Sequence, residues 1–259
     1  MRALSVLGRV LTTLGLLAAV AGLGTSGAQA KDLARACRHP VFVTSEWEGH
    51  GLGRYYADSD MWNAEGYDVS QTMRVCSHGN WSVSVRADNR AHDGAVKTYP
   101  NVHRDYHDWG TDHEPRLSSF RSIASTFASR SPGVGVYDGA YDIWLNGVAD
   151  DSSTELMIWT DNHRQTPAGE VVARHIAFSH RTWKLWATRD HRYLAFVPDR
   201  PLHHGRIALK KRFAYLVAHD YLPHRSTLGQ VCFGYEMVST NGTTQRFKVD
   251  RFSVTSSRR

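Results

Sequence analysis

The chain of 259 residues has few cysteines and lacks the short motifs of several large enzyme classes. Its three cysteines are too few for a disulfide scaffold, and no Cys-x-x-Cys pair is present to begin a structural zinc site or a thioredoxin-type redox centre. It also has no Gly-x-Ser-x-Gly nucleophile elbow, no Gly-x-x-x-x-Gly-Lys phosphate loop and no His-Glu-x-x-His helix. These absences argue against an α/β-hydrolase, a P-loop nucleotide hydrolase and a zinc protease of that type.

Charge of one sign does not dominate the sequence either. Lys and Arg together number 31 against 25 acidic residues, and the net charge of +6 is spread along the chain rather than gathered in one arm. We therefore expect no dedicated nucleic-acid binding. Aromatic residues are plentiful instead, with 8 Trp, 11 Tyr and 9 Phe, all of them after residue 30.

The first thirty residues predict a cleaved secretory signal peptide. Arg2 and Arg9 precede an uncharged, mostly apolar stretch over residues 10–23, and Ala28-Gln29-Ala30 has the small-x-small pattern of a cleavage site. The alternative is a retained membrane anchor, but this stretch is shorter than the roughly 20 apolar residues of a spanning helix. We expect cleavage after Ala30, and a secreted, extracellular chain of residues 31–259 without a membrane span.

Runs that alternate between apolar and polar side chains recur through residues 31–259. In residues 81–87 the two kinds take turns, as they do in a strand with one face on a core and the other in solvent. Similar runs lie near residues 40–47, 69–75, 122–127, 140–145, 155–160, 171–178, 182–187, 193–197, 230–238 and 245–254. Because no linker or repeat divides them, we expect a single domain.

One segment has helical spacing. Leu209, Phe213, Leu216 and Val217 follow the pattern i, i+4, i+7 and i+8, and we expect their neighbours Lys210, Lys211 and Arg212 on the outer side. The sequence therefore predicts an all-β fold, a curved two-sheet β-sandwich or jelly roll with one short covering helix near residues 207–219.

The three cysteines allow one disulfide in an oxidising compartment. Cys37 and Cys76 can pair across a separation of 39 residues, which leaves Cys232 unpaired. The spacing alone leaves pairings through Cys232 open.

A stretch rich in histidine and aspartate offers a possible metal site. His103, His107 and His113 alternate there with Asp105, Asp108 and Asp112. The same stretch contains turn-forming residues, so no helix presents the histidines on one face. We expect a solvated loop and no metal, with metal binding as the less favoured alternative.

Two glutamates lie inside strand-like apolar runs. Alternation places Glu155 on the same face as Met157 and Trp159, and Glu236 on the same face as Gly234. A carboxylate in the middle of such a run is costly unless its face lines a polar cleft. Two facing carboxylates are the requirement of glycoside hydrolysis, although each residue could also be a partly exposed strand residue.

Several segments resemble glycoside hydrolase family 12, the compact endo-β-1,4-glucanases and xyloglucanases. The similar segments run in the family's order over nearly all of residues 31–259. They are Lys97-Thr98-Tyr99-Pro100, Ala140-Tyr141-Asp142-Ile143-Trp144-Leu145, Thr154-Glu155-Leu156-Met157-Ile158-Trp159 with Pro167-Ala168-Gly169, and Gly234-Tyr235-Glu236 with Asn241-Gly242 and Phe252-Ser253.

The resemblance implies a role for each matching residue. Glu155 would be the nucleophile and Glu236 the general acid/base, on neighbouring strands of one concave sheet. Asp142 would hold Glu155 through a hydrogen bond. Trp62 would stack on a glucosyl ring, and Met157 would line the cleft floor. The family's N-terminal disulfide corresponds to Cys37 and Cys76.

Two departures from the family pattern affect sugar contacts. Ser59 and Asp60 replace an asparagine pair before Trp62, with Asn63 in place of the following glycine, and Val238 stands where many relatives have an aromatic residue. Cys232 has no counterpart, and its offset of four residues from Glu236 directs it toward the cleft face.

The sequence as a whole predicts a secreted, cofactor-independent, monomeric and retaining endo-β-1,4-glucanase. Its substrate would be a β-glucan polysaccharide, of the cellulose, mixed-linkage or xyloglucan type. The alternative is a non-catalytic jelly-roll protein that binds polysaccharide through the same cleft.

Overall fold

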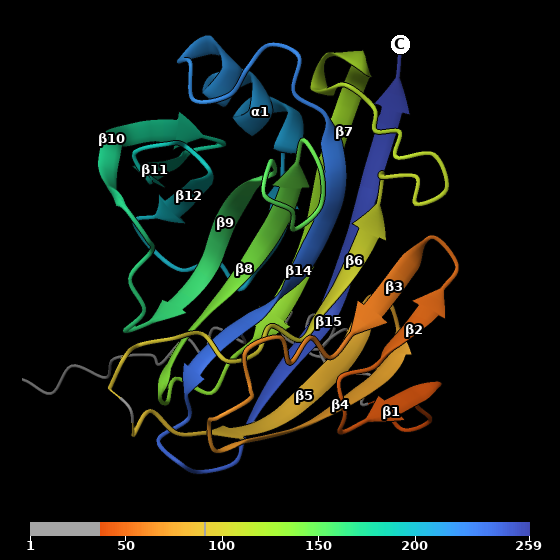
Figure 1. Cartoon of the computed structure of the whole chain (residues 1–259), viewed down its shortest axis with the longest axis vertical. Coiled ribbons are helices and arrows are strands. Elements are labelled where there is room, and N and C mark those ends of the chain that lie inside the picture. The colour runs from red at the N-terminus through yellow and green to blue at the C-terminus, as the bar shows by residue number, and fades with distance from the viewer. Residues whose placement is uncertain (1–36, 91) are drawn as a thin grey trace, which may run out of the picture. The chain divides into compact units, whose positions relative to one another are not determined.

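The computed structural model describes residues 37–90 and 92–259. They form two packed β-sheets with one α-helix, which confirms the all-β sandwich expected from the sequence (Figure 1). The expected signal peptide and its cleavage site after Ala30 lie outside the described residues. Within the described part, no helix is long and apolar enough to cross a membrane.

Six strands form the sheet on one side of the core. Their order is β1-β4-β5-β15-β7-β13. Their bounds are β1 Phe42–Thr44, β4 Val69–Ser77, β5 Asn80–Ala87, β15 Gln245–Arg258, β7 Phe120–Arg130 and β13 His204–Ile207.

The other sheet has nine strands, in the order β10-β11-β12-β9-β8-β14-β6-β3-β2. Neighbouring strands are antiparallel except for β12 and β9, which run parallel. Their bounds are β10 Glu170–Phe178, β11 Arg181–Ala187, β12 Tyr193–Pro198, β9 Thr154–His163, β8 Val136–Leu145, β14 Leu228–Ser239, β6 Asn101–Asp105, β3 Tyr55–Asp58 and β2 Gly49–Leu52.

The core lies between the sheets, because alternate residues of each strand point inward. On β5 these are Trp81, Val83 and Val85, and on β14 they include Phe233 and Tyr235, all of them fully buried. The other face of the nine-stranded sheet does not contact the six-stranded sheet. Its side chains are therefore available to form a site.

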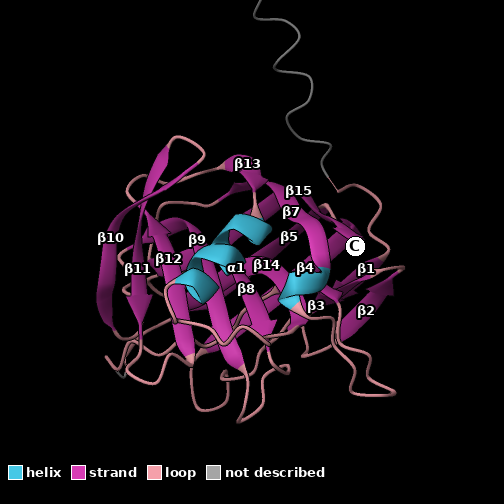
Figure 2. Ribbon diagram, turned by 90° about the horizontal axis from the view of Figure 1, so that it is seen from above, coloured by secondary structure: helices cyan, strands magenta, loops and turns pink. Residues whose placement is uncertain are grey.

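The helix α1, Leu209–Ala218, lies over one end of the sandwich (Figure 2). It buries Leu209, Phe213 and Leu216 as its spacing predicts. The expectation for Arg212 was wrong, because this side chain is buried and its guanidinium lies 4.6 Å from the ring centres of both Phe178 and Trp183. Cation–π contacts with two rings offset part of the cost of burying the charge. Burial nevertheless lowers the pKa of Arg212 to about 10.

A disulfide joins Cys37 to Cys76 with a Cα–Cα distance of 5.6 Å, and Cys232 is free and buried. The pairing expected from the family resemblance is therefore confirmed. The bond ties the segment before β1 to β4, the strand with which β1 pairs. In the loop-entropy description, closing a loop of this size contributes about 4 kcal/mol to stability.

Candidate active site

A cleft of about 1210 Å³ lies on the outer face of the nine-stranded sheet. Of the residues that the sequence predicted for the site, Glu155, Glu236, Asp142 and Trp62 line it, and Met157 does not. The other lining residues include seven further aromatic side chains and three further aspartates: Trp47, Tyr56, Tyr99, Trp109, Trp144, Trp159 and Tyr193, with Asp58, Asp60 and Asp105.

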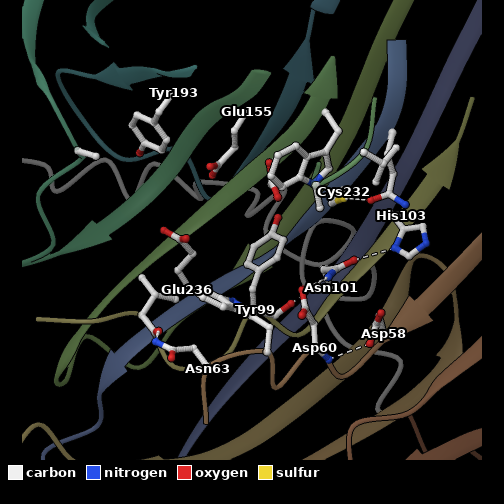
Figure 3. A pocket seen from close by; sticks show the side chains of 18 of the residues that line it. Asp58, Asp60, Asn63, Tyr99, Asn101, His103, Glu155, Tyr193, Cys232 and Glu236 are labelled. Carbon is white, nitrogen blue, oxygen red and sulfur yellow. Dashed lines mark hydrogen bonds between the residues drawn. The ribbon is translucent and has the colours of Figure 1, made fainter. Parts of the chain in front are cut away.

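Glu155 and Glu236 enter the cleft from opposite sides (Figure 3). Glu155 is the second residue of β9, and Glu236 lies in the last third of β14. We had expected the two strands to be neighbours, which was wrong, because β8 lies between them. Strand order depends on long-range pairing, which the local pattern around each glutamate does not encode. Each carboxyl group reaches the cleft over the side chains of β8.

The middle strand contributes two aspartates to this face. Asp142 on β8 lies opposite Met157 of β9 and Cys232 of β14, and Asp138 lies opposite Glu236. Both aspartates are buried, with 8% and 0% of their surface exposed. Four carboxyl groups therefore share the region where β9, β8 and β14 meet.

Burial raises the pKa values of all four carboxyl groups, and repulsion between charges adds to this for Glu155, Asp138 and Asp142. Loss of solvation, followed by the charge of Glu236, raises the pKa of Glu155 to about 8 from its ordinary value of 4.5. Loss of solvation also raises the pKa of Glu236, and a hydrogen bond with Asp138 opposes this change. The pKa values of Asp138 and Asp142 lie well above 3.8 for the same principal reason, desolvation. Near neutral pH the group therefore retains protons that exposed carboxylates would lose.

Asp142 is held differently from the sequence-based expectation. Within the described residues it forms no hydrogen bond with Glu155; the Trp144 indole donates to its carboxylate, and its Oδ1 atom has no hydrogen-bond partner. Asp142 and Glu155 interact through charge instead, which is the second cause of the raised Asp142 pKa, after desolvation.

Asp138 was not predicted from the sequence. Its two carboxyl oxygens are buried, and in the described part of the chain only Glu236 is placed to hydrogen-bond with them. The sequence did contain a signal for it: Asp138 lies four residues before Asp142 on β8, so both side chains point to the face of the sheet that carries the two glutamates.

The two residues expected to contact the sugar differ in accessibility. Trp62 is 54% exposed and lines the cleft. Met157 is 1% exposed, and its sulfur accepts hydrogen bonds from the Tyr193 hydroxyl at 3.2 Å and from Trp159 Nε1 at 3.3 Å. Met157 thus lies beneath two lining aromatic residues rather than among the lining residues, because β9 carries it under their rings.

Residues 53–256 match the family model of glycosyl hydrolase family 12. The chain belongs to this family. It is therefore a glycoside hydrolase, and the resemblance seen in its sequence is confirmed.

Solved family 12 structures share the fold. The xyloglucanase domain of NopAA, a type three effector from Sinorhizobium fredii, has a TM-score of 0.71 and 22% identity, with 84% of this chain and all of that chain covered. A family 12 xyloglucanase from Bacillus licheniformis has a TM-score of 0.72 and 20% identity, covering 83% of this chain and all of that one. Endoglucanase cel12A from Rhodothermus marinus has a TM-score of 0.71 and 22% identity, with 84% and 100% covered. No curated protein sequence matches the chain at a significant level.

A polar network extends the floor of the family 12 cleft toward β6 and β3. Asn101 donates to Asp60 Oδ2 at 3.3 Å and accepts from His103 Nδ1 at 3.0 Å. Asp60 has a left-handed backbone with φ of 42°, and Asp58 caps its N–H at 2.8 Å. Burial, followed by the charges of Asp58 and Glu236, raises the pKa of Asp60 to about 7.

Cys232 faces the cleft, as its offset from Glu236 predicted. Its thiol donates to Gln230 Oε1 at 3.0 Å, and Gln230 in turn donates to Asp105 Oδ1 at 2.7 Å. Burial raises the pKa of the thiol well above 9, so it stays protonated and unreactive near neutral pH.

The histidines of the aspartate-rich stretch have separate partners. The expected solvated loop was wrong for the first of them, because His103 lies on β6 with 8% of its surface exposed and pairs with Asn101 in the cleft. His107 pairs with Glu114 at 3.0 Å. His113 pairs with Asp108 through the backbone. In the part of the chain that the structure describes, no three His, Cys, Asp or Glu side chains gather to hold a metal ion.

Proposed function

We propose that this family 12 glycoside hydrolase is a secreted, monomeric, retaining endo-β-1,4-glucanase. The observation that carries the proposal is the pair of Glu155 and Glu236, which enter one cleft from opposite sides and interact through charge. The cleft runs from Tyr56 on β3 to Tyr193 on β12, which is five strand spacings or roughly 24 Å. A surface of this length suits the internal part of a β-1,4-glucan chain.

In the first step the ionised form of Glu155 attacks the anomeric carbon of the bound sugar. Its carboxylate forms a bond to that carbon as the glycosidic C–O bond breaks, and Glu236 transfers its proton to the departing oxygen. The products are a glycosyl ester on Glu155 and a shortened glucan with a free hydroxyl group. In the second step ionised Glu236 takes a proton from water, the water oxygen attacks the same carbon, and the ester bond breaks. Two inversions leave the anomeric configuration retained.

The neighbouring aspartates support the two charge states of the glutamates. Protonated Asp138 donates to Glu236, and this hydrogen bond favours the anionic form that Glu236 adopts after it gives up its proton. Asp142, whose raised pKa keeps it neutral, adds no permanent negative charge beside Glu155. Once Glu155 is esterified, its repulsion of Glu236 disappears, so Glu236 can act as the base.

Trp62 and Met157 contribute to sugar binding in different ways. The exposed indole of Trp62 offers a flat apolar face for the axial C–H groups of a glucosyl ring. Met157 acts indirectly, because its sulfur fixes the Tyr193 hydroxyl beside Glu155, the register partner of Tyr193.

Release of reducing ends from mixed-linkage β-glucan, xyloglucan and carboxymethylcellulose tests the proposal. We expect new ends from at least one of these substrates, and a loss of roughly a thousandfold or more of the rate in Glu155→Gln and Glu236→Gln. Binding of glucan by the wild-type chain without any new ends would support the alternative, a non-catalytic polysaccharide-binding protein.

Secretion is supported by the sequence pattern at the N-terminus and by the disulfide, since such bonds persist mainly in oxidising compartments. Protein recovered from the culture medium should begin at Lys31. Alkylation without reduction, after denaturation, should label Cys232 and leave Cys37 and Cys76 unlabelled. Retention of residues 1–30 on the recovered protein would contradict the cleavage assignment.

A further inference from the structure

Trp109 is an exposed aromatic residue of the cleft that the proposed reaction does not use. It lies in the segment between β6 and the short 3₁₀ helix Leu117–Ser119, and 64% of its surface is exposed. It nevertheless lines the same cleft as Glu155 and Glu236. An exposed indole that lines a cleft offers a large, flat apolar face to a ligand bound there.

Two contacts fix the orientation of this ring. The indole Nε1 donates to Asp105 Oδ2 at 3.5 Å, and the His107 ring lies 4.6 Å away at an interplanar angle of 61°. Both partners belong to the histidine- and aspartate-rich stretch whose sequence offered a possible metal site. In the structure that stretch has a different use, because it supports a tryptophan.

The segment that carries Trp109 is tied to the body of the domain through Glu114. This carboxylate, with 6% of its side chain exposed, accepts from the Gly147 N–H at 3.1 Å and from the Thr227 hydroxyl at 2.5 Å. It also pairs with His107 Nδ1 at 3.0 Å. The segment is thus fastened to the β8–β9 connection and to the residues that lead into β14. A ring held in this way loses little conformational entropy on binding.

Trp109 lies on the wall of the cleft opposite Trp62. The residue that anchors it, Asp105, is the register partner of Gln230 on β14. The same row of register partners continues through Trp144 on β8 to Glu155 on β9. Trp62, by contrast, precedes Asn63, whose backbone N–H donates to the carbonyl oxygen of Lys97. Lys97 in turn donates to the carbonyl oxygen of Met237, near the C-terminal end of β14. From β9 to β6 there are three strand spacings, roughly 14 Å, which separates Trp109 from Glu155. Glu236 lies six residues along β14 from Gln230, the register partner of Asp105, so Trp109 is remote from both reacting carboxylates.

We propose that Trp109 forms a further sugar-binding subsite, at which its indole stacks on a glucosyl unit of the β-1,4-glucan away from the bond that is cleaved. This inference rests on the proposed function and adds a contact on the Glu155 side of the cleft. Because of its distance from the carboxylates, the subsite is filled only by substrates that extend several units from the cleavage point.

Binding is measured by isothermal titration calorimetry in a Glu155→Gln background, with cellohexaose and cellobiose as probes. Trp109→Ala should weaken cellohexaose binding about three- to tenfold, the range of one aromatic contact, and leave cellobiose binding unchanged. Trp109→Phe should retain most of the affinity, whereas Trp109→Leu should lose as much as the alanine variant because it lacks a flat face. The melting temperature should change little in all three variants, since the ring is exposed.

The matched control is Val172→Ala, which removes an exposed apolar side chain on β10 that does not line the cleft. It should leave both affinities unchanged. Equal cellohexaose affinity in the Trp109→Ala and parent proteins would overturn the subsite alone. Absence of any glucan binding by the parent protein would overturn the proposed function as well.

Discussion

Asp138 lies directly opposite Glu236 in the register of β8 and β14, and Glu236 is its hydrogen-bond partner among the described residues. Both oxygens of this aspartate are buried, so it holds its proton and donates to the neighbouring glutamate. The relationship gives the proposed acid/base a built-in donor. It also links the titration of Glu236 to a residue that does not touch the reacting bond.

Replacing Asp138 should change the pH dependence of the reaction. Without the hydrogen bond from Asp138 the pKa of Glu236 rises, so in Asp138→Ala the basic limb of the kcat/KM profile should move to higher pH. The value of kcat should fall about tenfold, because the anionic form of Glu236 is less stabilised. Asp138→Asn retains an N–H donor and should recover most of the rate. A pH profile of Asp138→Ala that superimposes on the wild-type profile would refute this role.

The buried carboxyl groups should make the fold less stable as the pH rises. Glu155 loses its proton near pH 4.5 in the unfolded chain but near pH 8 in the folded chain, because burial raises its pKa to about 8. Between these values the folded state binds more protons, so the free energy of unfolding decreases as the pH increases. The Glu155→Gln variant has no titrating carboxyl group at this position. The difference between its melting temperature and that of the wild type should therefore increase from pH 4.5 to pH 8. Calorimetry at a series of pH values measures this difference, and a constant or decreasing difference would be inconsistent with the burial described here.

Trp62 should contribute to substrate binding rather than to folding. With 54% of its surface exposed, Trp62→Ala should leave the melting temperature within a few degrees and raise KM on long glucans about three- to tenfold. Trp62→Phe serves as the control that keeps an aromatic face. A large loss of stability with unchanged KM would show that the side chain serves packing instead.

Asp60 should influence the acid/base from the far side of the cleft. It interacts through charge with Glu236 and Asp142, and its own pKa of about 7 means that it is partly ionised in the neutral range. Asp60→Asn removes this negative charge, so Glu236 should lose its proton more readily, and the basic limb of kcat/KM should move down by about half a pH unit. The amide oxygen introduced by this substitution can still accept the hydrogen bond from Asn101. An upward shift of that limb would contradict the interaction.

Local sequence patterns predicted most of the strands but not their arrangement. The long alternating runs that became β4, β5, β14 and β15 were located because one face of each contacts a continuous core. The short strands β2, β3, β6 and β13 were missed, since four or five residues show too little alternation and pairing with neighbouring strands stabilises them. Strand order was also out of reach, which is why Glu155 and Glu236 were expected on adjacent strands.

The site was predictable to the extent that its residues interrupt apolar patterns. Glu155 and Glu236 stood out as carboxylates within strand-like runs, and the family resemblance added Asp142 and Trp62. Tyr193 was missed because a tyrosine in a strand is commonplace, and only the parallel pairing of β12 with β9 brings it beside Glu155. Arg212 was misplaced because two aromatic rings from β10 and β11 create a buried pocket for its charge, which the helix pattern alone does not contain.

The stereochemistry of hydrolysis tests the central claim most directly. A retaining pair requires carboxyl groups roughly 5 to 5.5 Å apart, with Glu155 as the nucleophile, whereas an inverting pair leaves a wider gap for water. Proton NMR during early turnover of a β-glucan follows the anomeric signals before mutarotation mixes them. We expect the wild-type enzyme to release the β-anomer first. In the presence of azide, the Glu155→Ala variant should convert an activated β-glycoside into an α-glycosyl azide. Initial release of the α-anomer by the wild-type enzyme would contradict the mechanism and the roles given to both glutamates.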